Sequence, residues 1–528
     1  MIMKINAGLQ SILFKFNYKP MWLFLLFYFI INTLFLTKFP FVHSDEFWLS
    51  GLSRNIMETG NISVTETFFD LYPRHPHAIK TIFHLVQVFF IKIFNYHIFT
   101  IRLISLLCGI LSLGCFFRLC LLITNSKKIS FASALLLSFD IQFIYASHFA
   151  RQEIILLFVL LCTLYSFFRH LDTHTLKHDI ILAAITGTAI GIHPNSFIIA
   201  VTMVSMYFYQ IWITKKFRFN NLVFFIMPLS IFALFFIALS FWCDPRFFFH
   251  YAAYGDQFGV LDPLISKIQE ITLFYLKLFY QISGTYYTPN IKFQFFLFTA
   301  IIVLTIIKLA CPQDRDQKHQ TISILIAIIA VNFSIILIGR YNQTSIVLQF
   351  PLFYLLAAYL FKDLKAGLRK ASILMIMAIL LTNSYQNIFP FLGHDYQRYI
   401  NEIAKAVPKN IPVLANLNCE PYFSQGKLFD YRNLAFLADH QITFKEYIRK
   451  NKIQYIIYPE EMDVIYQERP KWNGLYGSLT YYEDMIDFFH TNCRQVYQFS
   501  DPIYGIRIAP YINDKPWKIK IYQVLTWD

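Results

Sequence analysis

The sequence predicts a polytopic α-helical membrane protein that ends in a smaller α/β domain. Of the 528 residues, 56% are hydrophobic and 58 are Phe, which is too apolar for an ordinary soluble protein. Apolar runs long enough to cross a bilayer recur through residues 1–390, the expected transmembrane domain. Residues 391–528 instead carry short apolar stretches separated by polar ones, as a water-exposed domain does.

Eleven apolar segments are expected to span the membrane, because crossing the hydrocarbon core takes about 20 apolar residues in a helix. The first follows a basic N-terminus and has no small-residue cleavage site after it, so we interpret it as an uncleaved helix. Residues 77–95 hold too many polar side chains for a span and are predicted to form an interfacial helix. The eleven segments centre on 21–38, 100–122, 129–146, 153–169, 179–193, 195–213, 221–242, 291–309, 320–338, 345–361 and 371–389.

The basic residues predict the topology independently. Lys and Arg favour the cytoplasmic side, and they collect at the N-terminus and in alternate loops. This predicts a multi-pass plasma (inner) membrane protein with a cytoplasmic N-terminus, whose loops 39–99 and 243–290 and residues 391–528 face the outer, periplasmic side. It also explains the net charge of +14, so nucleic acid is not an expected partner. The cytoplasmic set includes Lys4, Lys15, Lys19, Lys127, Lys128, Lys177, Lys215, Lys216, Arg315 and Lys318.

Residues 391–528 have the pattern of an α/β domain large enough for its own core. Segments 411–416 and 453–458 are typical of short buried strands, and 444–451 and 481–490 of amphipathic helices. Cys419 and Cys493 also lie here, and they could form a disulfide if the domain faces an oxidising compartment.

An acidic pair, Asp45 and Glu46, follows the first span by a few residues. The apolar positions after it predict a short helix lying on the membrane surface. One interpretation is structural: Ser44 or Asp45 caps this helix, and Glu46 interacts favourably with its dipole. The other is catalytic, because a carboxylate in a partly dry site can take a proton from an attacking hydroxyl.

Other polar residues gather on the same predicted side of the membrane, at or beside the outer ends of helices. Cations among them could hold a phosphate, although each could also be an interfacial anchor or a contact to lipid headgroups. Asp140 is different, because it lies well inside the third span and must face the bundle interior or a partner such as Arg151. The candidate phosphate ligands are Arg74, His75, Lys80, Arg151, Arg340 and Tyr341, and the candidate supporting residues are Asp140, His148, Glu153, His193 and Asn195.

Several common site motifs are missing from the sequence. It has no Walker loop, no dinucleotide-binding glycine motif, no zinc spacing and no nucleophile elbow. A cytosolic nucleotide is therefore not expected as the direct substrate, and no cofactor is assigned. The outer His and carboxylate groups could bind a divalent metal, but no spacing demands one and no metal ligands are assigned.

Five features occur in a fixed order along the chain. They are the acidic pair in the first outer loop, a surface helix, an H-P step before a second interfacial helix, A-R-x-E opening the fourth span, and R-Y with a Pro in a late span. This order resembles the C-type membrane glycosyltransferases, in the bacterial branch related to protein O-mannosyltransferases and lipid A aminoarabinose transferases. The resemblance covers about residues 20 to 390, and the outward tail also fits it.

The resemblance implies transfer of a sugar from a polyprenyl-phosphate donor to a hydroxyl of a lipid, glycan or protein acceptor, among membrane lipids at the outer face. It implies Asp45 and Glu46 as catalytic residues, with Asp45 as the base and inversion at the sugar carbon. The aminoarabinose transferases usually carry Glu-Lys-Pro-Pro where this chain has Arg74-His75-Pro76-His77. This departure leaves the phosphate contact to His75 or Arg74.

Two other classes remain open on sequence grounds. A transporter or flippase would also be polytopic, but such proteins often carry inverted repeats and midplane sites, and no repeat is visible here. A polymerase or ligase of surface polysaccharide is the second. Its key residues would be expected in a large later loop, here Asp244, Arg246, His250 and Asp256.

Overall fold

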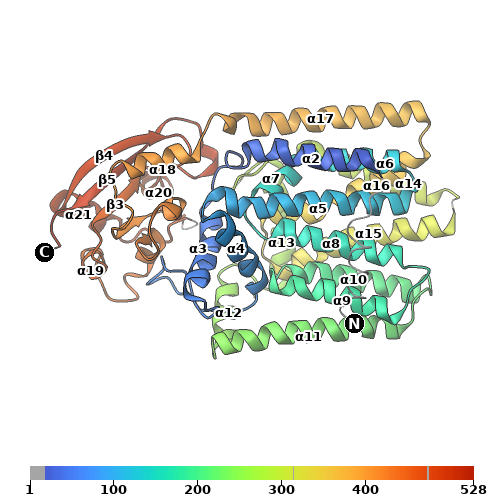
Figure 1. Ribbon diagram of the computed structural model, residues 1–528, viewed down its shortest axis with the longest axis horizontal. Coiled ribbons are helices and arrows are strands. Elements are labelled where there is room, and N and C mark those ends of the chain that lie inside the picture. Colours follow the sequence, from blue (N-terminus) through green and yellow to red (C-terminus); the bar gives the residue numbers. More distant parts are fainter. Residues whose placement is uncertain (1–17, 283, 313, 473–474, 528) are drawn as a thin grey trace.

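The computed structural model describes residues 18–282, 284–312, 314–472 and 475–527. Figure 1 shows long helices running side by side, with the C-terminal domain at one end of them. Lys4 and Lys15 lie outside the described residues.

Each apolar segment expected to span the membrane coincides with a helix or with two consecutive helices. Long runs of apolar residues favour helices here because a helix satisfies its own backbone hydrogen bonds in lipid. The helices are α2 (Lys19–Phe35), α5 (Ile98–Thr124), α6 (Lys127–Ser138) with α7 (Ile141–His148), α8 (Glu153–Arg169), α9 (Leu176–Thr188) with η1 (Ala189–Gly191), α10 (Ser196–Trp212), α11 (Phe219–Cys243), α14 (Lys292–Ala310), α15 (Arg315–Ile338), η2 (Gln343–Leu348) with α16 (Phe350–Asp363), and α17 (Ala366–Leu392).

In the described part of the chain, fewer helices than the eleven expected are long and apolar enough to be counted as membrane spans. Six helices among the described residues are long and apolar enough to cross a membrane, or seven if the bent pair α6–α7 counts as one. Helices α2, α8 and α10 have 17 residues each, at the short end of what crosses a bilayer. Eleven spans therefore stays a prediction.

The third expected span is not one straight helix, because α6 and α7 meet at an angle of 66°. Asp140 lies at this break and caps α7, accepting a hydrogen bond from the Gln142 backbone N–H at 2.8 Å. Of the two predicted alternatives, Asp140 faces the bundle interior and does not pair with Arg151: its carboxylate accepts a hydrogen bond from the Tyr354 hydroxyl at 2.6 Å. Asp140 is fully buried, as expected, and it is part of the helix packing.

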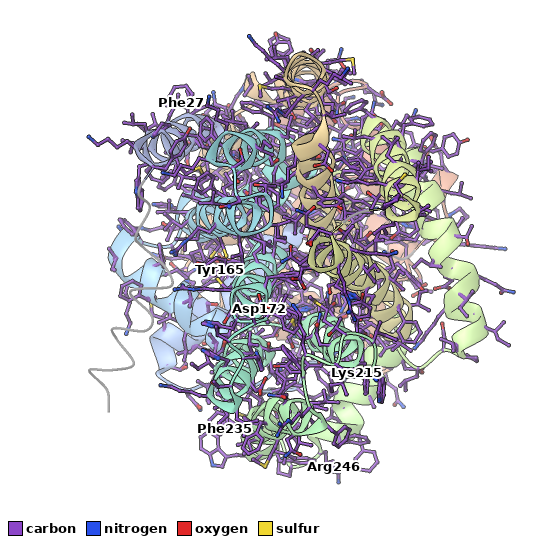
Figure 2. All side chains as sticks on the ribbon, turned by 90° about the vertical axis from the view of Figure 1, so that its right-hand side faces the viewer. Phe27, Tyr165, Asp172, Lys215, Phe235 and Arg246 are labelled. Carbon is purple, nitrogen blue, oxygen red and sulfur yellow. The ribbon has the colours of Figure 1, made fainter. Side chains whose placement is uncertain are left out.

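The basic loops meet at the end of the helices opposite the C-terminal domain. Lys216 Nζ lies 2.7 Å from an Asp172 oxygen and 3.1 Å from an Asp316 oxygen, so three separate connections converge there. Figure 2 looks onto this end, where Asp172 and Lys215 are labelled. The placement of this end in the cytoplasm stays a prediction.

At the other end lie four shorter helices, α3 (Ser44–Thr59), α4 (Thr81–Phe94), α12 (Phe247–Asp256) and α13 (Leu264–Phe279). Helices α3 and α4 pack against each other and lie next to the C-terminal domain (Figure 1). They correspond to the two helices predicted in the first outer loop. The expected cap of α3 is wrong, because His43 caps it: His43 Nδ1 accepts from the Asp45 N–H at 3.1 Å.

The C-terminal domain is built on a mixed five-stranded sheet of order β2-β1-β3-β5-β4, which confirms the predicted α/β class. Strands β1, β2 and β3 are parallel, and β5 pairs antiparallel with both β3 and β4. The elements are α18 (Tyr396–Ala404), β1 (Val413–Ala415), η3 (Leu417–Tyr422), β2 (Leu428–Asp430), η4 (Tyr431–Phe436), α19 (Phe444–Lys450), β3 (Tyr455–Pro459), α20 (Glu461–Glu468), α21 (Tyr482–Asn492), β4 (Cys493–Asp501), η5 (Ala509–Tyr511) and β5 (Trp517–Val524).

The two cysteines of this domain are free thiols, so the disulfide considered from the sequence is absent. Cys419 is buried in η3, whereas Cys493 begins the edge strand β4. Burial raises the pKa of the Cys419 thiol to about 12, which makes it a poor nucleophile.

The C-terminal domain is fixed by hydrogen bonds to the connection between α2 and α4, residues 36–80. The Asn418 amide donates to the Val42 carbonyl at 2.6 Å, and the Val42 N–H donates to the Tyr504 hydroxyl at 3.1 Å. The Asn433 side-chain oxygen accepts from the backbone N–H groups of residues 70, 71 and 72. The domain therefore covers the segment that carries Asp45.

A fully buried ion pair, Glu46–Arg102, holds the same segment from the membrane side. Arg102 donates to both Glu46 oxygens, at 2.6 and 2.8 Å, and neither side chain is exposed. Arg102 also donates to the carbonyls of Leu36, Pro40 and Phe41. Glu46 in turn accepts from the backbone N–H groups of His43 and Ala150, each at 3.0 Å. The pair thus ties α3, α5 and the junction between α7 and α8 together.

We predict that Arg102→Ala strongly destabilises the protein, because it leaves the Glu46 carboxylate buried without its cation. The expected loss is about 3–5 kcal/mol of folding free energy, seen as a lower melting temperature in detergent. Lys405→Ala is the control, since Lys405 forms an exposed pair with Glu402. Equal melting temperatures for the two variants would contradict the role given to Arg102.

Candidate active site

A cavity of about 890 Å³ lies between the membrane helices and the C-terminal domain. Its wall is formed by α3, the loop before α4, the α7–α8 junction and the loops after α13 and α15. The remaining wall is formed by α12 and the turn after it, by His193 before α10, by η4 and by the segment before α21. Segments far apart in the sequence therefore meet around one polar space.

Asp45 lies on this wall, in the first turn of α3, with its side chain 22% exposed. One carboxylate oxygen accepts from Arg151 Nη1 at 2.9 Å and also accepts from the Tyr286 hydroxyl. Tyr286 stacks on His43, with ring centroids 4.3 Å apart. The carboxylate is thus oriented from two sides.

The charge state of Asp45 follows from its neighbours. Burial favours the neutral acid, but His43, Arg151 and the Tyr286 hydroxyl outweigh burial and hold the pKa of Asp45 well below its usual range. Burial also lowers the pKa of His43 to about 4, so near pH 7 His43 is neutral and Arg151 is the cation that acts. Asp45 is therefore an ionised carboxylate near pH 7.

Glu46 does not reach this cavity. It points to the opposite side of the helix start, where Arg102 and two backbone N–H groups occupy its oxygens. The structure therefore separates the acidic pair into a cavity-facing carboxylate and one that fixes the position of its neighbour.

The cavity is strongly cationic. Among the described residues that line it, five are Lys or Arg and Asp45 is the single carboxylate. Such a surplus of positive charge around one anion favours a negatively charged ligand. The five cations are Arg74, Lys80, Arg151, Arg340 and Arg432.

Arg74 is held rigidly at the mouth of this site. Its guanidinium donates to both oxygens of buried Glu66, at 2.8 and 3.0 Å. It also lies over the rings of Trp48 and Tyr254, 5.3 and 5.2 Å from their centroids. Stacking and the two-pronged pair leave little rotamer freedom to lose when a ligand binds.

Lys80 and Arg340 make no ion pair with any residue that the structure describes. Burial together with Arg340, Arg74 and Arg151 lowers the pKa of Lys80 to about 7. Arg340 lies over the Phe258 ring, 4.1 Å from its centroid. These two cations are available for an anion, and an anion would relieve their mutual repulsion.

The other predicted site residues divide into three groups: residues that line the cavity, one residue behind its wall, and residues that lie elsewhere. His193 and Tyr341 line the cavity, and the Tyr341 hydroxyl donates to the Lys267 carbonyl. Glu153 lies behind the wall, 3.3 Å from Arg151. Four predicted residues do not line the cavity: Asp140, His148, Asn195 and His75. His148 forms hydrogen bonds with Phe39 and Asn32, and Asn195 forms one with Ser345. His75 lies beside His250.

Several residues of the candidate site escaped the sequence analysis. Tyr286 orients Asp45 from 241 positions away, and no local pattern marks it. Arg432 reaches the cavity from η4, donates to the Ser44 hydroxyl at 3.1 Å and stacks over Trp48. Arg102 did leave a signal, because it is an ionisable residue inside an apolar segment.

Comparisons with known proteins agree with this architecture. The sequence profile described as dolichyl-phosphate-mannose-protein mannosyltransferase matches residues 75–242. No curated protein matches by sequence.

Solved structures match over most of the chain. ArnT from Cupriavidus metallidurans bound to undecaprenyl phosphate is 12% identical, with a TM-score of 0.59 over 95% of this chain and 97% of that one. Its apo form gives a TM-score of 0.58 over the same shares. The Archaeoglobus fulgidus oligosaccharyltransferase in complex with Zn and sulfate is 14% identical, with a TM-score of 0.50 over 83% of this chain and 68% of that one. The chain therefore has the fold of the C-type membrane glycosyltransferases, which confirms the resemblance seen in its sequence.

Proposed function

We propose that this protein transfers a sugar from a polyprenyl-phosphate-linked donor to an acceptor hydroxyl at the outer face of the membrane. The observation that carries the proposal is the cavity at the domain boundary, where one ionised carboxylate faces five cations. A transferase of this kind needs both groups, because the leaving phosphate gains charge while the acceptor hydroxyl loses a proton.

The cations are proposed to hold the donor phosphate. Glu66 fixes Arg74 through its Nε and Nη2 groups, so the Nη1 side of the guanidinium is proposed to reach the phosphate. Lys80 and Arg340 form no ion pair with a carboxylate among the described residues. Undecaprenyl phosphate is bound in the similar ArnT structure, which supports a lipid-phosphate donor here. Tyr341 and His193 line the same wall and are proposed to contact the phosphate or the sugar.

Asp45 is proposed to act as the general base. The acceptor oxygen attacks the anomeric carbon, the bond from that carbon to the phosphate oxygen breaks, and the acceptor proton passes to Asp45. A single displacement of this kind inverts the sugar carbon. Arg151 lies 2.9 Å from Asp45 and also lines the cavity, so a phosphate that attracts Arg151 would make Asp45 a stronger base.

The proposal includes the orientation of the chain. Residues 1–390 form the membrane domain, and residues 391–528 cover the site from the periplasmic side. The acceptor, whether lipid, glycan or protein, enters beneath this domain. The cavity sits at one end of the helices, which favours a transferase over a transporter or flippase with a site at the midplane.

We predict that Asp45→Asn lowers sugar transfer by at least about a hundredfold, because amide nitrogen cannot accept the acceptor proton. The measurement is transfer from a polyprenyl-phosphate sugar by purified protein, with unchanged melting temperature. Asp395→Asn is the matched control, since exposed Asp395 only caps α18. Full activity of the Asp45 variant would remove the assignment.

Arg340→Ala is expected to weaken donor binding about tenfold, which corresponds to about 1.4 kcal/mol for one charge-assisted contact. Donor titrations should show the change in KM with little change in kcat. Arg246→Ala, at an exposed outer position that does not line the cavity, is the control. A donor KM that does not change would count against a phosphate contact by Arg340.

Donor binding is also expected to weaken as the pH rises from 6 to 8. The pKa of Lys80 is lowered to about 7, so Lys80 is charged below that pH and loses its charge above it. A donor phosphodiester keeps one negative charge throughout, Asp45 stays ionised and His43 stays neutral. We expect a roughly three- to tenfold rise in donor Kd, which Lys80→Arg should abolish because Arg stays charged. An equally steep profile in that variant would assign the titration to another group.

A further inference from the structure

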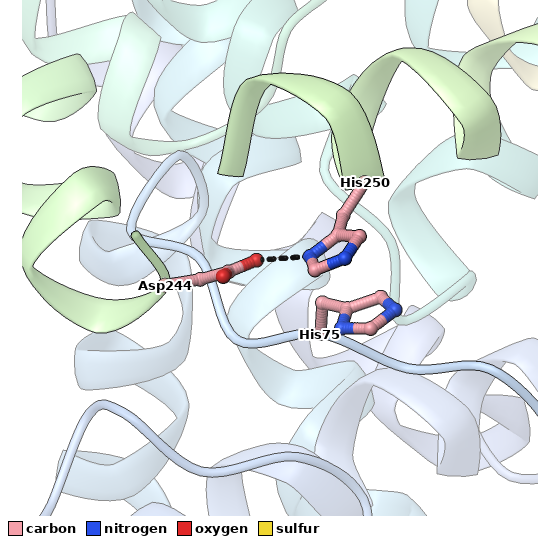
Figure 3. Close-up of side chains that lie close together, drawn as sticks. All are labelled: His75, Asp244 and His250. Atoms are coloured by element: carbon pink, nitrogen blue, oxygen red, sulfur yellow. Dashed lines mark hydrogen bonds and ion pairs between the residues drawn. The ribbon is translucent and has the colours of Figure 1, made fainter. Parts of the chain in front are cut away.

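Three potential metal ligands meet beside the cavity, from parts of the chain that are distant in sequence. His75 lies in the loop before α4, Asp244 directly follows α11 and His250 lies on α12 (Figure 3). One ligand atom of each residue lies within 4.8 Å of the others. Figure 3 shows the two imidazoles stacked beside the carboxylate.

The geometry already brings these groups close. Asp244 Oδ2 lies 2.6 Å from His250 Nδ1, and the two imidazole centroids are 3.5 Å apart with their planes at 12°. Asp244 is buried, and its other oxygen accepts from the Arg246 N–H at 2.9 Å, which fixes the carboxylate. A small cavity of about 90 Å³ adjoins all three side chains, so an ion and a water molecule have room.

We propose that His75, Asp244 and His250 bind a divalent transition metal, with zinc as the best match. Two imidazole nitrogens and one carboxylate oxygen are a common zinc donor set, with water completing the tetrahedron. Ligand atoms around tetrahedral zinc lie about 3.3 Å apart, a distance that small side-chain rotations reach here. The metal takes no part in the bond changes of the proposed transfer reaction.

The metal would join two outer loops. His75 belongs to the first outer loop, and Asp244 and His250 belong to the loop after α11. The small cavity shares Arg74, Tyr254 and Gln257 with the main cavity, so the metal would brace the wall that carries Arg74. It also gives His75 a role away from the donor phosphate.

The test is zinc binding by the full-length protein purified in detergent with a histidine-free affinity tag. After removal of metal with EDTA, Zn²⁺ is titrated against a chromophoric competitor, and bound zinc is counted by mass spectrometry after gel filtration. The variants are His75→Ala, Asp244→Asn and His250→Ala. His440→Ala is the control, because His440 is exposed in the C-terminal domain and distant from the cluster in sequence.

The wild type and the His440 variant should each bind about one zinc ion per chain, and zinc should raise their melting temperatures. Each ligand variant should bind at least tenfold more weakly and lose the zinc-dependent stabilisation. A wild type that binds no zinc would overturn the site, and so would ligand variants that bind as tightly as the control. A wild-type protein that binds zinc at this site but transfers no sugar would contradict the transferase proposal and leave the zinc site supported.

Discussion

The buried Glu46–Arg102 pair is the constraint on which the site depends. Arg102 contacts both oxygens of Glu46 and three backbone carbonyls of the segment between α2 and α3, and all of these contacts are sheltered from water. Removing either charge would leave the other unpaired in a dry environment, so the loop has one strongly preferred position. Because Asp45 precedes Glu46 on α3, this pair sets where the cavity carboxylate lies. His43 caps α3 by accepting a hydrogen bond from the Asp45 N–H, which also fixes the first turn of this helix.

The charges around the cavity are arranged in two groups. Three cations are held by carboxylates: Arg74 by Glu66, Arg151 by Asp45 and Glu153, and Arg432 by Asp430. Lys80 and Arg340 have no such partner among the described residues, and burial near other cations lowers the pKa of Lys80. We propose that the paired cations give the site its shape and that the unpaired ones bind the anion. A phosphate would therefore stabilise an arrangement that is electrostatically unfavourable without it.

Much of the fold could be predicted from the sequence, because hydrophobic length and periodicity determine where helices form. The apolar segments, α3, α4 and the parallel strands β1 and β3 all follow from local patterns. The strands β4 and β5 could not be predicted from such patterns, because β4 is largely exposed and lacks a continuous apolar face. The break at Asp140 was missed for another reason: its side chain caps α7, which a hydropathy pattern does not reveal.

The site was only partly predictable. Asp45, Arg74, Lys80, Arg151 and Arg340 do line one cavity, because their helix ends share one side of the bundle. His75 follows Arg74 in the sequence but does not line this cavity, because its side chain stacks on His250. Tyr286 and Arg432 depend on contacts between segments hundreds of residues apart, and these contacts leave no local pattern.

The most direct test of the central claim is an experimental structure of the protein with a polyprenyl-phosphate sugar bound. The account predicts that the phosphate lies in the domain-boundary cavity, within hydrogen-bonding distance of at least two of Arg74, Lys80 and Arg340. The sugar should lie between this phosphate and Asp45. A phosphate bound elsewhere, near the middle of the helices or at their basic end, would contradict the account.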